Sequence, residues 1–590
     1  MRYRSTRKWD AVQDSSNLLY FAQLIEELLF DFSLDTYKPS AMNTSLLCKE
    51  ALETIFEIDE GNIKKPNLQH ILDELCVNLS KDIVSNKLIN LDSGAIFAGL
   101  KNPKSSVHDK KVITELLARQ TELNKYKSTN ENLLKSAISC PEDNFSEIRS
   151  LTRSYITTLI NSGYSSKHIF KLAQQYFYYG SNRISSNEAI QEFLAFFSKK
   201  ADEYHILYRG SPVFESIAPS CSRFDIAITK DGSEFNVDIS KYNFALRKDE
   251  VYISITKVNA KDVYVAKQRA DERLELLSTL YTLFHHKEHL PYLADCLVIN
   301  NTDNSVHKSK TTVNTMHKCI DHVPVKASSK LNKFVSDFSL ERTSFKKFTR
   351  SAELHSLALA SDSTENQMIN LWIAIESIIP AKSDDDNISN IEHIINSLTP
   401  FLSMVYLDRL IARLTTDLLN WNKHEFLAQI SGINGSGLAE KLVKLMALSE
   451  YEERRNRLIE SFNDFHLLSD RFNYFCDILS SPANVASLID NHNTRVSWQI
   501  RRIYRARNLI VHSGKTPSYT KILIENTHDY LDVVMGSLMK LATKPKEIQS
   551  IEQGFKYAEL SYLSFYKWLS AKGAQFDDAS ITRIIDKKVI

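Results

Sequence analysis

Glycine and proline, the residues that most often interrupt regular structure, are both scarce in this chain. There are 14 glycines and 13 prolines among 590 residues, so positions that end or kink a helix are few. Hydrophobic residues make up 43% of the chain and charged residues 25%, which is the composition of an ordinary globular protein. We therefore expect a predominantly α-helical protein, whose length requires several domains.

Cysteine is sparse and long apolar runs are missing. The seven cysteines stand singly, with no C-x-x-C pair, which argues against a disulfide framework and against a cysteine-rich zinc site. No stretch has the apolar length of a membrane span, and the opening residues MRYRSTRKWD are not followed by a signal-peptide core. These absences predict a cytoplasmic protein with no membrane partner.

The sequence divides into four regions, three with a helical pattern and one with a mixed pattern. Residues 1–204, 346–545 and 546–590 show apolar residues at helical spacing, whereas residues 205–345 mix strand and helix patterns. In this small α/β domain we expect a hairpin over residues 224–239, turning at Asp231-Gly232. Further strands are expected at VYISIT, DVYVA and ADCLVIN, and a helix at RADERLELLSTLYTLFHHK.

Three polar or glycine-rich stretches invite a functional reading that their spacing does not support. HHKEH contains His285, His286 and His289, which do not share one helix face, so we expect a solvated helix end. SDDDN lacks the alternating oxygen ligands and the glycine of a calcium loop. GINGSG lacks the lysine-serine ending of a phosphate loop. The sequence therefore predicts no metal and no cofactor.

The stretch RARNLIVHSG, residues 505–514, has the densest set of candidate functional groups. On a helix over residues 498–513, Arg501, Arg505, Asn508 and His512 fall at i, i+4, i+7 and i+11, which is one stripe. Arg507 lies about 140° around the helix from His512. It joins that stripe only if its side chain wraps round, if the helix ends or kinks, or if a second chain supplies it.

The residues around this stripe are basic, and the opposite face of the helix is apolar. No acidic residue occurs between Asp490 and Glu525, where the seven cations are Arg495, Arg501, Arg502, Arg505, Arg507, Lys515 and Lys521. In a chain with a net charge of +1 this predicts a local anion-binding surface, with phosphate as its guest. The face opposite the stripe carries Ile503, Ala506 and Ile510, and we expect it to pack against a core. Gly514 is expected to end the helix.

A second helix is expected upstream. ENQMINLWIAIESIIP places apolar residues at helical spacing, with Glu376 at the rim of the apolar face. Glu376 is either an ordinary residue at the edge of a core helix or a supporting residue of the candidate site around His512.

Taken together, Arg507-Asn508-x-x-x-His512 and the LWIAIES helix resemble the HEPN superfamily, and more closely its ApeA-like branch. The mark of that family is an arginine, often followed by asparagine, with a histidine four to six residues after the arginine. The likeness covers residues 346–545, about a third of the chain. It implies a helical bundle that forms a homodimer or a higher homo-oligomer, in which two copies of the motif meet.

In many members of the family this bundle is a metal-independent endoribonuclease. The resemblance implies that His512 assists proton transfer as the 2′-hydroxyl of RNA attacks the phosphate, and that Arg507 stabilises the charge that develops. Asn508 is expected either to orient the ring or to bond a phosphate oxygen. Arg501, Arg502, Arg505 and Lys515 are expected to bind RNA phosphates. ApeA-like proteins are similar to abortive-infection defence factors, so residues 1–345 are expected to respond to a trigger of phage origin.

Two other readings remain open at this stage. In the first, the domain binds RNA or a nucleotide without cutting it. In the second, the protein is a helical scaffold whose basic helix pairs with an acidic partner.

Overall fold

A computed structural model describes residues 1–590 apart from residues 11, 31–32, 62–63, 236, 288, 311–313, 318–321, 383–387, 544–545 and 586–590. It is mostly helical, with 67% helix and one small antiparallel sheet in the described part of the chain, as the composition predicts. The SDDDN stretch lies outside the described residues. Of the helices described, none combines the length and the apolar character needed to cross a membrane.

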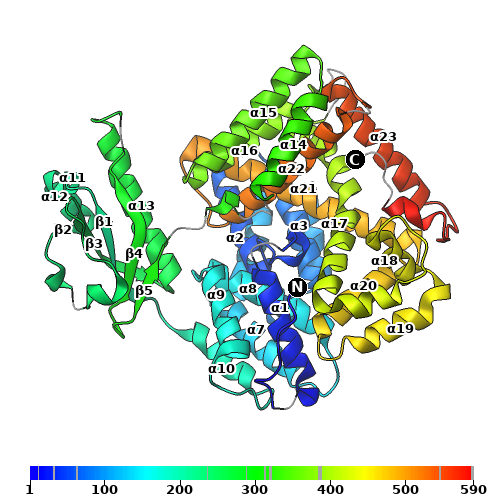
Figure 1. The fold of residues 1–590 in the computed structure, drawn as a ribbon, viewed down its shortest axis with the longest axis horizontal. Helices are drawn as coiled ribbons and strands as arrows, with labels where there is room; N and C mark the ends of the chain where they lie inside the picture. The colour runs from blue at the N-terminus through cyan, green and yellow to red at the C-terminus, as the bar shows by residue number, and fades with distance from the viewer. Residues whose placement is uncertain are drawn as a thin grey trace. The chain divides into compact units, whose positions relative to one another are not determined.

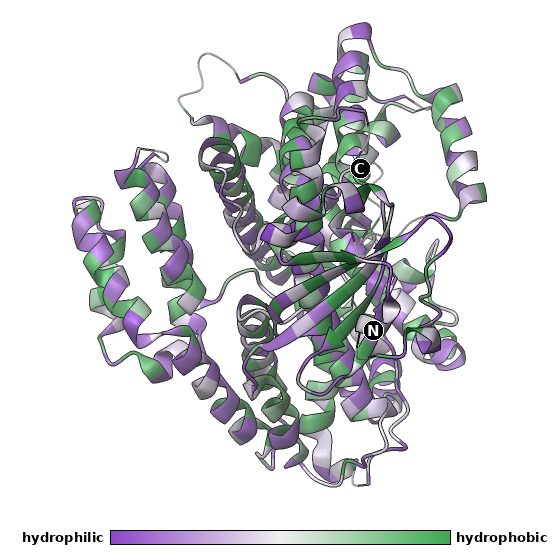
Figure 2. Ribbon diagram, turned by 90° about the vertical axis from the view of Figure 1, so that its left-hand side faces the viewer, coloured by the Kyte–Doolittle hydropathy of each residue, from purple (hydrophilic) through white to green (hydrophobic). Residues whose placement is uncertain are grey.

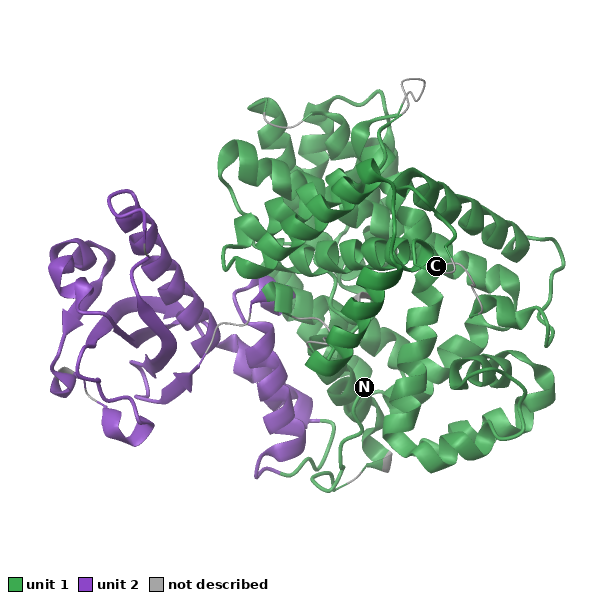
Figure 3. Cartoon of the chain, turned by 45° about the horizontal axis from the view of Figure 1, so that its top comes forward, with its two compact units in different colours: residues 1–157, 183–187, 315–590 green, residues 158–182, 188–314 purple. Residues whose placement is uncertain are grey.

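The chain divides into two compact units, which are described separately (Figure 3). Unit 1 comprises residues 1–157, 183–187 and 315–590, and unit 2 comprises residues 158–182 and 188–314. All five tryptophans, at positions 9, 372, 421, 498 and 568, belong to unit 1. Tryptophan fluorescence therefore reports the unfolding of unit 1 alone.

Unit 1 is built from both ends of the sequence. Its first group of helices is α1 (Ser16–Leu29), α2 (Thr44–Asp59), α3 (Pro66–Lys81), α4 (Ile83–Leu88), α5 (Ser93–Lys101), α6 (Val107–Gln120), α7 (Leu123–Ile138) and α8 (Phe145–Asn161), whose end passes into unit 2. Its second group is α14 (Pro324–Asp337), α15 (Arg342–Ala360), α16 (Thr364–Ile378), α17 (Asn390–Gln429), α18 (Leu438–Ala447), α19 (Glu452–Ser461), α20 (His466–Ile478), α21 (Pro482–Ser513), α22 (Thr520–Leu541) and α23 (Ile551–Leu569). Helix α1 packs against α20, and α3 packs against α21 (Figure 1). The two groups thus share one core.

Unit 2 contains the sheet. Its elements are α9 (Ser166–Gln174), α10 (Ala189–Ala195), β1 (Asp202–Gly210), α11 (Val213–Ser216), α12 (Ala218–Cys221), β2 (Ile226–Thr229), β3 (Val251–Ala260), α13 (Val263–Thr282), β4 (Tyr292–Asn300) and β5 (Val306–Ser309). The strands are antiparallel in the order β2-β3-β1-β4-β5. Figure 2 shows that the strands, like the helices, mix hydrophobic and hydrophilic residues. Helix α13 covers one face through Ala266, Ala270 and Leu274.

Two strand predictions in this unit are wrong. The expected hairpin over residues 224–239 does not form, because β2 pairs with β3. The Asp231 and Asp238 carboxylates accept hydrogen bonds from the backbone N–H groups two residues on, which favours turns over a strand. Phe235 and Ile239 instead pack on the other face of the sheet.

The second wrong prediction is the DVYVA strand, which is the first turn of α13. Asp262 caps that helix by accepting hydrogen bonds from the backbone N–H groups of Tyr264 and Val265. The VYISIT and ADCLVIN strands are confirmed as β3 and β4. HHKEH begins beyond the end of α13, with its three histidines exposed, and GINGSG connects α17 to α18.

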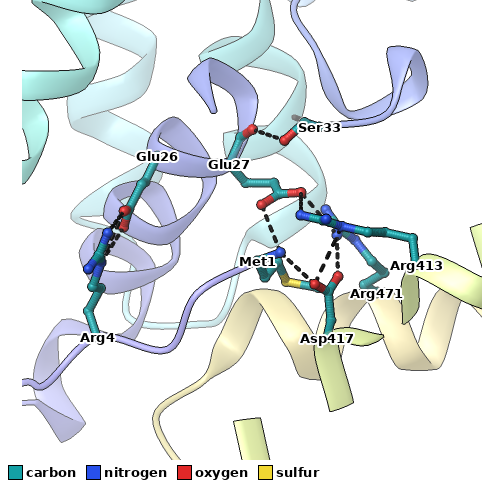
Figure 4. Close-up of polar contacts among 8 residues, drawn as sticks. All are labelled: Met1, Arg4, Glu26, Glu27, Ser33, Arg413, Asp417 and Arg471. Carbon is teal, nitrogen blue, oxygen red and sulfur yellow. Dashed lines mark hydrogen bonds and ion pairs between the residues drawn. The ribbon is translucent and has the colours of Figure 1, made fainter. Parts of the chain in front are cut away.

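The amino-terminal amine lies inside unit 1, within a cluster of charged groups (Figure 4). The amine of Met1 is 2.6 Å from an oxygen of Asp417 and 3.1 Å from an oxygen of Glu27. Arg413 and Arg471 approach the same two carboxylates at 3.4 to 3.8 Å. All of these groups except Arg413 are nearly inaccessible to solvent, so their charges compensate one another in place of water.

We expect the two carboxylates of this cluster to differ in their contribution to stability. Burial alone would raise the pKa of Glu27, but Arg471, the Met1 amine and Arg413 outweigh it and lower that pKa. At Asp417 burial dominates and raises the pKa. Glu27→Gln should therefore lower the free energy of unfolding by about 2 to 3 kcal/mol, and Asp417→Asn by less. Urea unfolding followed by tryptophan fluorescence measures both, and an equal or larger loss for Asp417→Asn would contradict this account.

Candidate active site

Helix α21 carries the predicted motif on its last turns. The helix begins with Pro482 at its first position, where the Ser481 side chain accepts a hydrogen bond from the Asn484 backbone N–H. It ends at Ser513, because Gly514 adopts the left-handed conformation with φ of 63° and donates its N–H to the Ile510 carbonyl. The predicted C-cap is confirmed.

The apolar side of α21 is also confirmed, since Ile503, Ala506 and Ile510 are buried. The carboxyl-terminal end of the motif is accessible to solvent, because His512 is exposed in the last turn of α21. The side chain of each motif residue is thus placed by the same helix that anchors the core.

Arg507 and Asn508 contact each other, and Asn508 shares a face with His512. The guanidinium Nη1 of Arg507 donates to Oδ1 of Asn508 at 3.0 Å. Among the described residues, the buried Nε of Arg507 has no hydrogen-bond partner. Because α21 continues unbroken to Ser513, Arg507 remains about 140° around the helix from His512. In one chain Asn508 and His512 therefore share a helix face, whereas Arg507 leaves the helix outside that face and its guanidinium contacts Asn508.

The other arginines of the predicted stripe are buried against carboxylates from distant parts of the chain. Arg502 binds Glu50 through Nε at 3.1 Å and through Nη2 at 3.0 Å, and its Nη2 also lies 2.6 Å from Glu74. Arg505 donates to Glu50 at 2.8 Å. The exposed fractions of the Arg502, Arg505 and Glu50 side chains are 2%, 4% and 3%. These two guanidinium groups hold α21 against α2 and α3.

The remaining two predicted phosphate ligands are paired as well. Arg501 is buried and donates to Glu392 of α17 at 2.6 Å. Lys515 lies 2.6 Å from Glu57 of α2, although 59% of the Lys515 side chain is exposed. The anion-binding surface that the sequence predicted at these four positions is therefore largely occupied by carboxylates of the same chain, and only Lys515 reaches solvent.

The buried network formed by Arg502, Arg505, Glu50 and Glu74 contains two carboxylates whose pKa values are shifted in opposite directions. Burial alone would raise the pKa of Glu50, but Arg502 and Arg505 outweigh it and lower the pKa to about 2. At Glu74 burial dominates and raises the pKa, although Arg502 opposes it. Glu50 is therefore the principal counter-charge of the two arginines at neutral pH.

Glu376, the predicted supporting residue, is exposed near the end of α16. Helices α16 and α21 are antiparallel, since Thr516 donates to Glu365 at 2.6 Å and the Trp372 and Tyr504 rings lie 5.6 Å apart. Along these axes Glu376 is about 6 Å beyond Trp372, whereas His512 is about 12 Å beyond Tyr504 in the other direction. The structure does not bring Glu376 to His512.

The left-handed cap residue gives a direct test of how the motif is held. A Cβ atom at Gly514 would meet no atom within 4 Å, so Gly514→Ala should cost only the backbone strain of about 1 to 2 kcal/mol. Gly536 is exposed inside α22 and also has open space around it. Gly536→Ala should stabilise unit 1 by about 1 kcal/mol. Urea unfolding with tryptophan detection distinguishes the two, and a shift of the same sign in both variants would contradict the assigned conformation of Gly514.

Comparison with known proteins gives no relative for this chain: no protein-family model, no curated protein and no solved structure matches it significantly.

Proposed function

We propose that the chain is a metal-independent endoribonuclease of HEPN type, whose active site is built on the last two turns of α21. The observation that supports this most directly is the exposed His512 in a capped last turn, on the same helix face as Asn508, which is itself bonded to Arg507. An imidazole, a carboxamide and a guanidinium are the groups that the proposed cleavage requires.

In this reaction the 2′-hydroxyl oxygen of RNA forms a bond to the adjacent phosphorus, and the bond to the 5′-oxygen of the next nucleotide breaks. Neutral His512 accepts the 2′-hydroxyl proton, and the 5′-oxygen takes a proton from water as it leaves. Arg507 stabilises the charge that develops on the phosphorane. The products are a 2′,3′-cyclic phosphate and a 5′-hydroxyl.

The complete site requires two chains. Arg507 and His512 lie on different sides of a regular helix, so a two-fold homodimer that apposes two α21 ends is the arrangement that brings one chain's arginine to the other chain's histidine. The expected partner is therefore a second copy of this chain, with RNA bound across the interface.

A second candidate function is a non-catalytic RNA- or nucleotide-binding module. It is favoured by one observation, the burial of Arg501, Arg502 and Arg505 in ion pairs. This burial leaves fewer cations to attract the long anionic backbone of RNA. The third reading, a basic helix that pairs with an acidic partner protein, has less support, because the acidic partners of Arg501, Arg502 and Arg505 are in the same chain.

The test is cleavage of total cellular RNA by the purified full-length protein in EDTA, with mapping of the product ends. Cyclic phosphate ends, together with growth arrest on overexpression, would support the ribonuclease and its role in abortive infection. Bound but intact RNA in both settings would favour the non-catalytic module. In the defence role, residues 1–345, which include the sheet of unit 2, would respond to a phage-derived trigger in the cytoplasm, and phage infection would relieve the restraint on cleavage.

A further inference from the structure

Helices α15 and α22 bring two imidazoles and a carboxylate together at a place that the proposed cleavage does not use. His355 lies on α15, and His528 and Asp532 lie one turn apart on α22. One ligand atom from each residue lies within 4.8 Å of the other two. We propose that these three residues form a binding site for a zinc ion or a similar divalent transition-metal ion.

The distances suit a metal better than direct hydrogen bonds. Nε2 of His355 is 3.7 Å from Oδ1 of Asp532, and Nε2 of His528 is 3.4 Å from Oδ2 of the same carboxylate. Ligand atoms around a tetrahedral zinc ion, with bonds of about 2.0 to 2.1 Å, are separated by about 3.3 Å. The two nitrogen–oxygen distances are within a few tenths of an ångström of this separation, and all three ligand atoms lie within 4.8 Å of one another.

An unsatisfied polar atom at the same place points to a missing ligand. Nε2 of His355 is shielded from solvent and, in the described part of the chain, has no hydrogen-bond partner. Such an atom costs free energy unless something binds to it. The two imidazole rings lie 4.9 Å apart and tilted by 36°, so both nitrogens reach the same small volume beside Asp532.

The nature of the ligands selects the ion. Two imidazole nitrogens favour zinc, copper, iron or nickel over magnesium and calcium, which prefer oxygen. The Asp532 side chain is 52% exposed, whereas the His528 side chain is 7% exposed, so the site opens to solvent on the aspartate side. Three protein ligands leave a tetrahedral position for water. The ion would also tie α15 to α22, two helices of unit 1 that are far apart in the sequence.

This inference does not rest on the proposed ribonuclease activity, and its test has a different readout. Untagged full-length protein is stripped with EDTA, transferred to metal-free buffer and titrated with zinc chloride by calorimetry. We expect one tight site per chain. His355→Ala and Asp532→Asn should each weaken it by more than about 100-fold, because even changes to outer-shell partners cost about 10- to 100-fold.

The control variant is His286→Ala, which removes an exposed imidazole of the HHKEH stretch and should leave the tight site unchanged. Zinc should also raise the urea midpoint of tryptophan-detected unfolding in the wild type but not in Asp532→Asn. The half-exposed Asp532 can be replaced without loss of core contacts, so this variant guards against misfolding. Absence of tight zinc binding in the wild type would overturn the proposal, as would tight binding that survives His355→Ala or disappears in His286→Ala.

Discussion

His512→Ala is expected to lower the rate of RNA cleavage by about 100- to 10,000-fold, the range that general acid–base catalysis by one side chain contributes. His512 is exposed at the end of α21, so its loss should leave the free energy of unfolding of unit 1 unchanged. Single-turnover cleavage of a defined RNA measures the rate, and tryptophan fluorescence in urea measures stability. RNA affinity should change little, which separates a role in proton transfer from a role in binding.

The matched control is His424→Ala, which removes an exposed imidazole from α17 and should leave cleavage intact.

Mixing His512→Ala protein with Arg507→Ala protein tests whether each active site is shared between two chains. If each site combines one chain's Arg507 with the other chain's His512, mixed dimers regain one active site, and an equal mixture recovers roughly a quarter of the wild-type rate. Two inactive proteins that stay inactive when mixed would exclude the shared site, and wild-type cleavage by His512→Ala would exclude the ribonuclease mechanism proposed for this residue.

The features of α21 that the sequence predicted correctly are all local. The Gly514 cap and the buried positions of Ile503, Ala506 and Ile510 depend on residues within a few turns. The helical period and the preference of glycine for positive φ determine these features wherever the helix packs. The mostly helical character of the chain follows from its composition in the same way.

The environment of the arginines could not be predicted from that local pattern. Glu50 and Arg502 are separated by 452 positions, and Arg501 and Glu392 by 109. A gap in acidic residues along the sequence therefore says nothing about carboxylates that fold in from elsewhere. One signal was present: Glu50, Thr54 and Glu57 recur at i, i+4 and i+7 on α2 and are all buried. Polar residues at this spacing lie on one face of a helix, so they form a shared polar contact when that face is buried.

The pairing of these groups changes how the basic end of α21 is understood. Arg502 and Arg505 donate hydrogen bonds to Glu50 and Glu74, so the proposed substrate contacts on this helix are reduced to Arg507, Asn508 and His512. The ion pairs keep α21 in place against α2 and α3, which orients the motif. Phosphate binding by this chain should accordingly depend on residues at the helix end and on Lys515, not on the buried stripe.

The contribution of the buried network is best tested at Glu50. Glu50→Gln leaves Arg502 and Arg505 in the core with only Glu74 as a counter-charge. Removal of one partner from a buried ion pair costs about 3 to 5 kcal/mol, and we expect a loss of this size in the free energy of unfolding of unit 1. Glu74→Gln is the control. Because burial raises the pKa of Glu74, its ionised form contributes less, and this variant should lose less stability.

The pH dependence provides an independent check on the same network. The pKa of Glu50 is about 2 in the folded chain and about 4.3 in an unfolded one. Its contribution is therefore fully present above about pH 4.3 and is lost as the pH falls toward 2. The raised pKa of Glu74 acts in the opposite sense, favouring the folded state at low pH.

Urea midpoints between pH 7 and pH 3 should fall less steeply on acidification in Glu50→Gln than in the wild type, because that variant has already lost the titrating group. A parallel decline in the two proteins, or an equal loss of stability in Glu74→Gln and Glu50→Gln at pH 7, would show that Glu50 is not the principal counter-charge of the arginines.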